Sequence, residues 1–464
     1  MPRYRELVGI GEGGLVYEYT SSIGHDGEIF REAVLVLLTH GLHLLEKGLA
    51  PEGQMCRVLA ALLEALAAGP GEVIREGYED VWEALEDWLY SRVDGAAGWL
   101  WLGRSRNDHV SAALRLYARE RLAEAMLGVI EARRTLLEQA AGLRDVPVLL
   151  HTHGQPSQLA TLDCLLLAWE ESLASSYRLL AGAYMLVDRS PLGASAGAGT
   201  LAPLEPGRLA WLLGFSQVIG NPVYAAGSRL DVTAAAAAAA LFLTEASRIA
   251  GDMMLYSSPY VGALELPAGH VATSSVMPHK RNPASLEVLR ARAGRAAGLL
   301  AGLLAVQKGL PSGYSLDLQE ANPLLYMLLR DAASTAGVLA DILRGARWRR
   351  ERLRELAETY MAWGAELAEA LALREGKPFR EAYAEAAQAI NEGRAAELLH
   401  SLGYRNPLEL AWGRATGCAP GRGLEEARRR LRSDAAEAER LAERAAEPLR
   451  RVVEKAREVA QRCR

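Results

Sequence analysis

Apolar residues recur at intervals of three and four along most of this chain, and alternating runs of β-branched residues are nearly absent. This spacing places apolar side chains on one face of a helix. In the segment 30–47, Leu38, Leu42 and Leu45 share such a face, and the glycine and proline that follow predict its end. The pattern predicts an all-α fold.

Long segments rich in alanine and leucine predict five further helices in the middle of the chain. They span residues 108–142, 158–187, 231–256, 283–304 and 320–344. Small side chains allow helices to approach closely, so we expect these five to form a bundle. The charged segment 424–464 has opposite charges at i,i+4, such as Glu425 with Arg429, and predicts a solvated helical surface.

The run 232–243, with its consecutive alanines, is the most membrane-like part of the sequence. It is shorter than the roughly 20 residues that a spanning helix needs, and Glu245 and Arg248 follow at once. We expect a buried bundle helix here and no membrane partner. The first residues lack the apolar stretch of a signal peptide, which favours a cytoplasmic protein.

Composition and charge narrow the classes of protein. The 464 residues suggest two or three domains, and 50% hydrophobic with 23% charged residues is an ordinary globular balance. The net charge of −5 provides no general basic field, so we expect no nucleic-acid partner. The four cysteines are far apart and form no Cys-x-x-Cys pair, which favours neither structural zinc nor a disulfide.

Three polar stretches interrupt the helices at residues 103–109, 151–158 and 262–282. The chain has no Gly-rich phosphate loop, HExxH or GxSxG motif, which argues against a kinase, a zinc protease and an α/β-hydrolase. The third stretch combines Ser274, Lys280 and Asn282 just before a predicted helix start. Such a start offers unpaired N–H donors to an anion, although capping and solvent exposure also explain these residues.

Three motifs add a family resemblance. The run Thr-Ser-Ser-Val-Met-Pro-His-Lys-Arg-Asn-Pro at 273–283 closely resembles the signature of the fumarase/aspartase superfamily, with Thr273 where a glycine usually stands. Gly-Arg-Ser-Arg-Asn-Asp at 103–108 looks like the segment of the argininosuccinate lyase family, and His-Thr-His-Gly-Gln-Pro at 151–156 matches the superfamily's Thr-His-x-Gln segment. With the segment 376–382, the resemblance covers nearly the whole chain.

The resemblance implies reversible elimination of argininosuccinate to arginine and fumarate, with no cofactor and no metal. It makes Ser274 the general base, Lys280 and Asn282 the charge-stabilising groups, and His153 a proton-handling residue oriented by Glu287. The substrate-binding residues that it implies are Ser22, Asp26, Ser105, Arg106, Asn107, Thr152, Gln155, Tyr314 and Gln319. Helix capping is an alternative role for the two serines in this set, and a surface ion pair is an alternative for Glu287.

The resemblance also implies an architecture and an assembly. It predicts an N-terminal helical domain over residues 1–107, a central long-helix bundle over 108–350 and a small C-terminal helical domain over 351–464. Four chains would form a homotetramer in which each active site takes its loops from three different chains. The separation of Ser105, His153 and Ser274 along the sequence is compatible with such shared sites.

Three positions depart from the family pattern. Trp82 stands where the family has histidine, Asn322 where it has a substrate-contacting lysine, and Leu230 where an arginine directly precedes the aspartate, so that Arg229 is displaced. These changes leave the elimination residues in place but bear on substrate identity. Another fumarate-releasing lyase, such as an adenylosuccinate lyase, and a non-catalytic crystallin-like relative therefore stay as alternatives.

Overall fold

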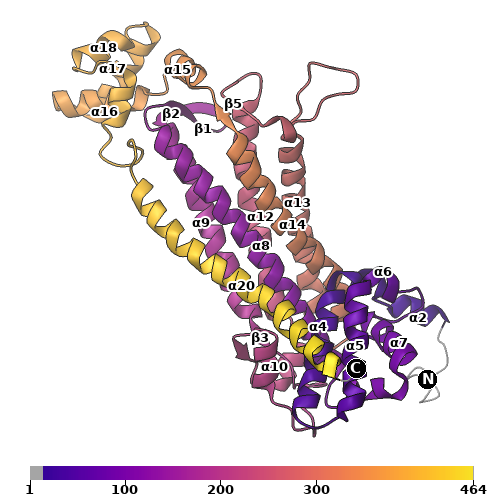
Figure 1. The fold of residues 1–464 in the computed structure, drawn as a ribbon. Helices are drawn as coiled ribbons and strands as arrows, with labels where there is room; N and C mark the ends of the chain where they lie inside the picture. The colour runs from indigo at the N-terminus through magenta and orange to yellow at the C-terminus, as the bar shows by residue number, and fades with distance from the viewer. Residues whose placement is uncertain (1–13, 463–464) are drawn as a thin grey trace.

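The computed structural model describes residues 14–462, which form helices and three short two-stranded sheets. The prediction of an all-α fold is confirmed. Figure 1 shows an elongated molecule in which long helices run side by side. The N-terminal helices lie at one end of this bundle and the small helices α15–α18 lie at the other.

The N-terminal helices pack around α4 (Phe30–Glu46), which is buried on nearly every side. The other elements of this part are α2 (Gly14–Thr20), α3 (Ile23–Asp26), η1 (Gly27–Ile29), α5 (Glu52–Ala68), α6 (Pro70–Val73), α7 (Val81–Val93) and η2 (Asp94–Trp101). Asp80 caps α7, because its carboxylate accepts the backbone N–H of Glu83 at 2.8 Å. This cap fixes the acidic segment that precedes α7.

Five long helices form the bundle. They are α8 (Arg106–Gly142), α9 (Leu162–Val187), α12 (Leu230–Ser257), α13 (Ala284–Gln307) and α14 (Asp317–Gly345). Helix α8 packs against α9 and α14, and α12 packs against α9, α13 and α14. A Cβ atom on Gly128 of α8 would lie 2.7 Å from the Cβ of Ala336 on α14. Glycine at 128 therefore lets these two backbones approach closely, as the small residues predict.

Buried ion pairs join neighbouring helices of the bundle. Arg115 of α8 lies 2.6 Å from Asp231 of α12, and both side chains are fully buried. Arg133 of α8 lies 2.8 Å from Glu170 of α9 in a similarly buried position. Removing one partner of such a pair leaves a buried charge and typically costs about 3–5 kcal/mol. These contacts therefore hold α9 and α12 in one register on α8.

Helix α12 is the only described helix that is long and apolar enough to cross a membrane. Its most apolar window is 61% buried within the protein, where it packs against its neighbours in the bundle. The alanines of this helix therefore serve close packing, as expected for a core helix.

Short strands connect the long helices. β1 (Pro147–Thr152) and β2 (Gln155–Thr161) form an antiparallel hairpin. The predicted start of a helix at residue 158 was wrong, because residues up to 161 pair with β1 and α9 begins only at Leu162. The remaining short elements are β3 (Arg189–Ser190), α10 (Pro206–Leu212), β4 (Gln217–Val218), α11 (Pro222–Gly227), β5 (Leu264–Glu265), η3 (Ala268–His270) and β6 (Arg347–Trp348).

The chain after the bundle first forms a small helical unit. It contains α15 (Arg350–Thr359), α16 (Gly364–Glu375), α17 (Phe379–Asn391), α18 (Ala395–Ser401) and α19 (Pro407–Trp412). Trp363, Leu367, Leu371 and Leu399 belong to a buried cluster of this unit that is separate from the main core. Residues 363–410 thus have a small core of their own, whereas other parts of the predicted domain 351–464, such as Leu353 and Leu424, belong to the main core.

The last helix, α20 (Leu424–Arg462), returns along the bundle as the yellow helix of Figure 1. It packs against α8, α9, α5 and α4. Leu431, Leu441 and Val452 are buried, and Asp434 lies 2.7 Å from Arg133. The prediction of a merely solvated surface was wrong for this face, because apolar residues at helical spacing lie between the charges.

A disulfide joins Cys164 at the start of α9 to Cys418 in the loop before α20, with the two Cα atoms 5.6 Å apart. The prediction of no disulfide was therefore wrong. The two cysteines are 254 residues apart, so their spacing along the chain gives no sign of the pairing. The bond ties the segment that leads into α20 to the base of the β1–β2 hairpin.

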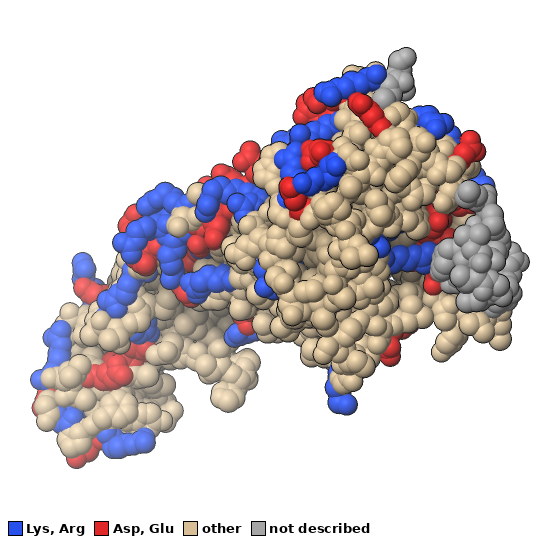
Figure 2. All heavy atoms as spheres, turned by 90° about the horizontal axis from the view of Figure 1, so that it is seen from below, with Lys and Arg blue, Asp and Glu red and all other residues tan. Residues whose placement is uncertain are grey.

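Outside the grey atoms, Figure 2 shows acidic and basic side chains interspersed on the face viewed, with wide uncharged areas between them. A surface of mixed sign gives little long-range attraction for a polyanion.

Candidate active site

A cavity of about 100 Å³ lies where the N-terminal helices meet the first turns of α8 and α14. Its lining includes six of the predicted substrate-binding residues, which come from three separate segments. The six residues are Ser22, Asp26, Arg106, Asn107, Tyr314 and Gln319. The fold therefore brings together residues almost 300 positions apart in sequence, since Gln319 donates a hydrogen bond to the carbonyl of Thr20 across a separation of 299 residues.

Asp26 is a buried carboxyl group in this cavity, with 4% of its surface exposed. It accepts hydrogen bonds from the Ser22 hydroxyl at 2.8 Å and from the backbone N–H of Val81 at 3.0 Å. Burial disfavours its charged form and raises its pKa to about 7, although both hydrogen bonds act in the opposite direction. Asp26 is thus poised to ionise when a cationic group enters the cavity.

Arg106, the first residue of α8, faces two carboxylates of the segment before α7. Its guanidinium lies 2.7 Å from Glu79 and 3.1 Å from Asp80. Burial raises the pKa of Asp80, while Arg106 acts to lower it. With Asp26, the cavity has three carboxyl groups and one guanidinium in its lining, which suits a ligand with a cationic end. Glu79 and Asp80 were not among the predicted binding residues, although their place before a helix start is visible in the sequence.

Ser105 caps α8 and is not among the residues that line the cavity. Its hydroxyl accepts the N–H of Asn107 at 3.2 Å, and its own N–H donates to Asp108 at 3.1 Å. The Asp108 carboxylate also accepts the N–H groups of Gly193 and Ser195. Ser105 therefore has the capping role that was its alternative, and this cap sets the position of Asn107.

Tyr314 and Gln319 approach the cavity from the start of α14. The guanidinium carbon of Arg229 lies 5.9 Å from the centre of the Tyr314 ring, within the range of a cation–π contact. Burial raises the pKa of the Tyr314 hydroxyl, so it stays a neutral hydrogen-bonding group near neutral pH. Arg229 is buried despite its displaced position in sequence.

Two of the three departures from the family pattern lie in this cavity. Trp82 and Asn322 both line it, and both are buried. The Trp82 ring packs edge-on against His109 with 5.6 Å between ring centres. Leu230 is instead 63% exposed. Trp82 and Asn322 are therefore placed to affect substrate preference, whereas Leu230 does not line this cavity.

Ser274 lies in a loop that is closed at its base by a β-bridge between Ala272 and Asn282. The Ser274 Oγ accepts the backbone N–H of Val276 at 3.2 Å and of Met277 at 3.0 Å. Such donors favour an oxygen that carries negative charge. Lys280 belongs to the same loop and is exposed.

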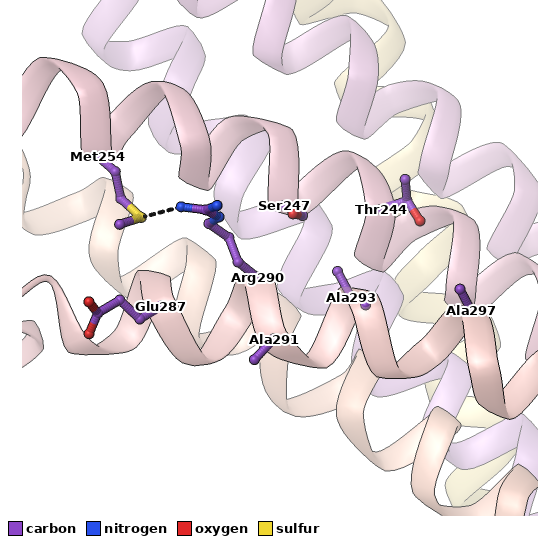
Figure 3. A pocket seen from close by; sticks show the side chains of 9 residues that line it. Thr244, Ser247, Met254, Glu287, Arg290, Ala291, Ala293 and Ala297 are labelled. Carbon is purple, nitrogen blue, oxygen red and sulfur yellow. Dashed lines mark hydrogen bonds between the residues drawn. The ribbon is translucent and has the colours of Figure 1, made fainter.

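Glu287 lies in the first turns of α13, on an exposed surface. It lines an open cavity of about 750 Å³ between α12 and α13 together with Met254 and Arg290. Figure 3 shows one hydrogen bond among the drawn side chains, from Arg290 to the Met254 sulfur. His153 is not among the residues that line this cavity.

His153 occupies the tip of the β1–β2 hairpin, between the paired residues Thr152 and Gln155. His153 and Gly154 both have positive φ, of 55° and 73°, as a two-residue hairpin turn requires. The hairpin places Thr152, His153 and Gln155 together on an exposed tip. The polar composition of this segment signalled a loop, but it did not reveal the strands on either side.

The predicted site residues therefore form two sets at opposite ends of the bundle. Arg106 lies in the cavity at the start of α8, and the hairpin follows the end of that helix. With 37 residues, α8 is about 55 Å long at 1.5 Å per residue. Helix α14 likewise begins beside the cavity, which its Gln319 lines, and it ends at Gly345, close to the segment that leads into the Ser274 loop. Figure 1 shows the long loop above α13 at the same end as β1 and β2.

Comparison with known proteins gives a class and a family. A family model described as a lyase matches residues 43–298. The argininosuccinate lyase of Pyrobaculum calidifontis is 44% identical over 414 residues, 88% of this chain and 94% of that protein. The argininosuccinate lyase of Sulfurisphaera tokodaii is 39% identical over 382 residues, 82% of this chain and 83% of that protein.

Solved structures share the fold. A variant of EDDS lyase with bound fumarate superposes with a TM-score of 0.81 at 25% identity, over 94% of this chain and 93% of that one. A class II fumarase from Schistosoma mansoni has a TM-score of 0.67 at 17% identity, over 83% of this chain and 91% of that one. The long-helix bundle with its polar loops thus defines a lyase of the fumarase/aspartase superfamily. Within that class, the chain belongs to the argininosuccinate lyase family.

Proposed function

We propose that this enzyme cleaves L-argininosuccinate to L-arginine and fumarate, as a step of arginine biosynthesis. The relatives at 39–44% identity are argininosuccinate lyases, and the related EDDS lyase variant holds fumarate. The observation that carries the proposal is the hydrogen-bonded Ser274 hydroxyl in a loop with Lys280 and Asn282.

The proposed reaction is a β-elimination with Ser274 as the general base. The Ser274 oxygen takes a proton from the carbon next to a carboxylate of the succinyl group, which leaves a dianionic aci-carboxylate. The carbon–nitrogen bond then breaks, its electron pair stays with the guanidinium nitrogen, and an acid supplies a proton to that nitrogen. A double bond forms between the two central carbons, which yields fumarate.

A serine can act as a base only if its deprotonated form is stabilised. If its hydroxyl pKa lies about six units above neutrality, deprotonation costs about 8 kcal/mol at about 1.36 kcal/mol per unit. The N–H groups of Val276 and Met277 offset part of this cost, since hydrogen bonds to charged groups contribute about 1.5–3 kcal/mol each. Lys280 adds a positive charge from the same loop, and exclusion of water would strengthen all three interactions.

Other groups complete the proposed mechanism. Lys280 and Asn282 stabilise the negative charge that develops on the succinyl carboxylate. His153, oriented by Glu287, handles the proton that reaches the leaving nitrogen. Thr152 and Gln155 on the hairpin tip assist at the succinyl end.

The acidic cavity is proposed to hold the arginine end of the substrate. The Asp26 carboxylate accepts hydrogen bonds from a cationic group, with Ser22, Asn107, Tyr314 and Gln319 as neighbouring polar groups. Arg106 positions the carboxylates of Glu79 and Asp80 beside the same group. The raised pKa of Asp26 implies that binding of the cation releases a proton near neutral pH.

A homotetramer with shared active sites is part of the proposal. It is supported by the two residue sets at opposite ends of the bundle, because substrate has to meet both sets at once. Exposed apolar residues on α12, α13 and α14, such as Leu241, Val288 and Val338, offer surfaces for contact between copies. Sedimentation of a monomer in analytical ultracentrifugation would contradict this assembly.

The alternative is another fumarate-releasing lyase with a different amine product. Trp82 and Asn322 in the cavity favour this alternative, since they replace residues that the family uses there. A non-catalytic crystallin-like role is a further alternative and predicts no turnover of any succinyl adduct. A cytoplasmic location stays a prediction. Fumarate release from argininosuccinate by the purified protein, followed by its ultraviolet absorbance, tests the proposed function.

A further inference from the structure

His270 joins three elements at the base of the Ser274 loop. Its Nδ1 lies 2.9 Å from the Ser285 hydroxyl, and its Nε2 lies 3.0 Å from the Asp341 carboxylate. His270 ends η3, Ser285 lies in the first turn of α13, and Asp341 lies near the end of α14. The His270 side chain is only 13% exposed.

These contacts join the two segments that lead into and out of the loop, which we call its stems. His270 comes two residues before Ala272 and Ser285 comes three residues after Asn282, and those two residues form the bridge that closes the loop. The imidazole therefore connects both stems of the loop through its bond to Ser285. Because a carboxylate only accepts hydrogen bonds, Asp341 holds the proton of the neutral ring on Nε2, which leaves Nδ1 to accept the Ser285 hydroxyl.

The stem before the loop is held on α14 by further contacts. β5 pairs with β6, which directly follows α14. A Cβ atom on Gly345 would lie 2.6 Å from the ring of Pro267, so glycine is needed at the end of α14 to seat this segment. The stem is thus fixed, whereas the residues between Thr273 and Arg281 are mostly exposed.

We propose that His270, with Ser285 and Asp341, is a positioning residue that sets the Ser274 loop for catalysis, an inference that rests on the proposed function of Ser274. A hydrolytic Ser–His–Asp triad would have the serine on Nε2 and the aspartate on Nδ1. Here the partners of the two ring nitrogens are exchanged, and Asp341 is 62% exposed. This arrangement fits a structural connection between the two stems of the loop. A misplacement of about 1 Å at a reacting group can cost about a hundredfold in rate.

The test compares His270→Ala with two conservative variants. In His270→Asn the amide nitrogen lies near the place of Nδ1 and keeps a contact with Ser285, and in His270→Gln it lies near the place of Nε2 and keeps a contact with Asp341. We expect His270→Ala to lower kcat for fumarate release by about tenfold to a hundredfold with KM within about twofold. The conservative variants should recover part of kcat. Arg344→Gln is the matched control, because it removes the other partner of Asp341 without touching His270.

A second measurement does not depend on activity. Amide hydrogen exchange in the segment 271–286 should be faster in His270→Ala than in the wild type and unchanged in Arg344→Gln, without substrate. Asp341→Asn, a change at an exposed position, should raise this exchange rate by less than His270→Ala does. Combined with His270→Ala in a double variant, it should cause no further increase. If His270→Ala has the kcat and the amide exchange rate of the wild type, the proposal is overturned. It is also overturned if the effects of His270→Ala and Asp341→Asn are fully additive in the double variant. If the wild type releases no fumarate, the proposed function fails. The exchange measurement still decides whether His270, Ser285 and Asp341 hold the loop in position.

Discussion

The Oγ atom of Ser274 lies 3.0 Å from the backbone nitrogen of Met277 and accepts its N–H. A second N–H, from Val276, points at the same oxygen. This arrangement places two donors where a serine base would carry negative charge. The loop geometry therefore supplies a physical basis for the proposed role of Ser274 as a base, which residue type alone does not explain.

Replacement of Ser274 by alanine should remove the proposed base. We expect kcat to fall by at least about a hundredfold, a typical scale for a positioned base. The circular dichroism spectrum should be unchanged, because Ser274 is in a partly exposed loop. Ser275→Ala is the matched control and should keep most of the activity. Turnover by Ser274→Ala at the wild-type rate would remove this residue from the mechanism.

Asp26 should make stability depend on pH. Burial raises its pKa from 3.8 to about 7, so the folded protein keeps a proton that the unfolded chain has released. Stability should therefore fall as pH rises from about 4 to about 7, by an amount on the order of 4 kcal/mol for this group alone. In Asp26→Asn this loss is absent.

The difference in melting temperature between Asp26→Asn and the wild type, measured without substrate, should change with pH. It should shift by a few degrees in favour of Asp26→Asn as the pH rises from 5 to 8. Asp145→Asn is a suitable control, since that carboxylate is largely exposed. The variant should also bind argininosuccinate more weakly at pH 8. A constant difference in melting temperature over this pH range would contradict the assignment of a raised pKa to Asp26.

Shared active sites predict complementation between inactive variants. Ser274→Ala lacks the base at one end of the bundle, and Asn107→Ala lacks a cavity residue at the other end. Co-expression of the two should yield mixed assemblies in which some sites carry neither change, with an activity well above that of either variant alone. Activity no higher than the mean of the two separate variants would mean that each chain supplies a complete site.

The disulfide between Cys164 and Cys418 should stabilise the folded chain. It closes a loop of 254 residues, for which chain entropy predicts about 5 kcal/mol, while measured disulfides typically contribute about 2–4 kcal/mol. Cys418→Ser should therefore lower the melting temperature by a few degrees. Non-reducing peptide mapping of the wild type should recover the linked pair. Free thiols at both positions would contradict the bond.

The sequence predicts the bundle well for a physical reason. Helix α14 repeats apolar residues with the period of a helix over many turns, and this local pattern determines which face is buried. The β1–β2 hairpin depends on pairing between two short segments, so a polar segment around His153 gave no sign of it. In α20 the charges obscured a buried face that includes Leu431 and Leu441.

The sequence motifs predict candidate site residues but not the geometry in which the fold places them. The motifs identify Ser274 and Arg106, yet they do not reveal that a helix about 55 Å long lies between the two sets. The motifs also do not reveal that Asp26 is buried and accepts a hydrogen bond from the N–H of Val81. This contact depends on how α7 packs beside α3. Long-range contacts of this kind come from the tertiary fold, and the pairing of Cys164 with Cys418 is another example.

Release of fumarate by the purified wild-type protein tests the central claim most directly. Argininosuccinate and adenylosuccinate should be supplied in parallel, with fumarate followed by ultraviolet absorbance and the amine product identified by mass spectrometry. We predict equal amounts of fumarate and arginine from argininosuccinate, and much slower turnover of adenylosuccinate. No fumarate from argininosuccinate, under conditions in which an established argininosuccinate lyase is active, would contradict the proposed function.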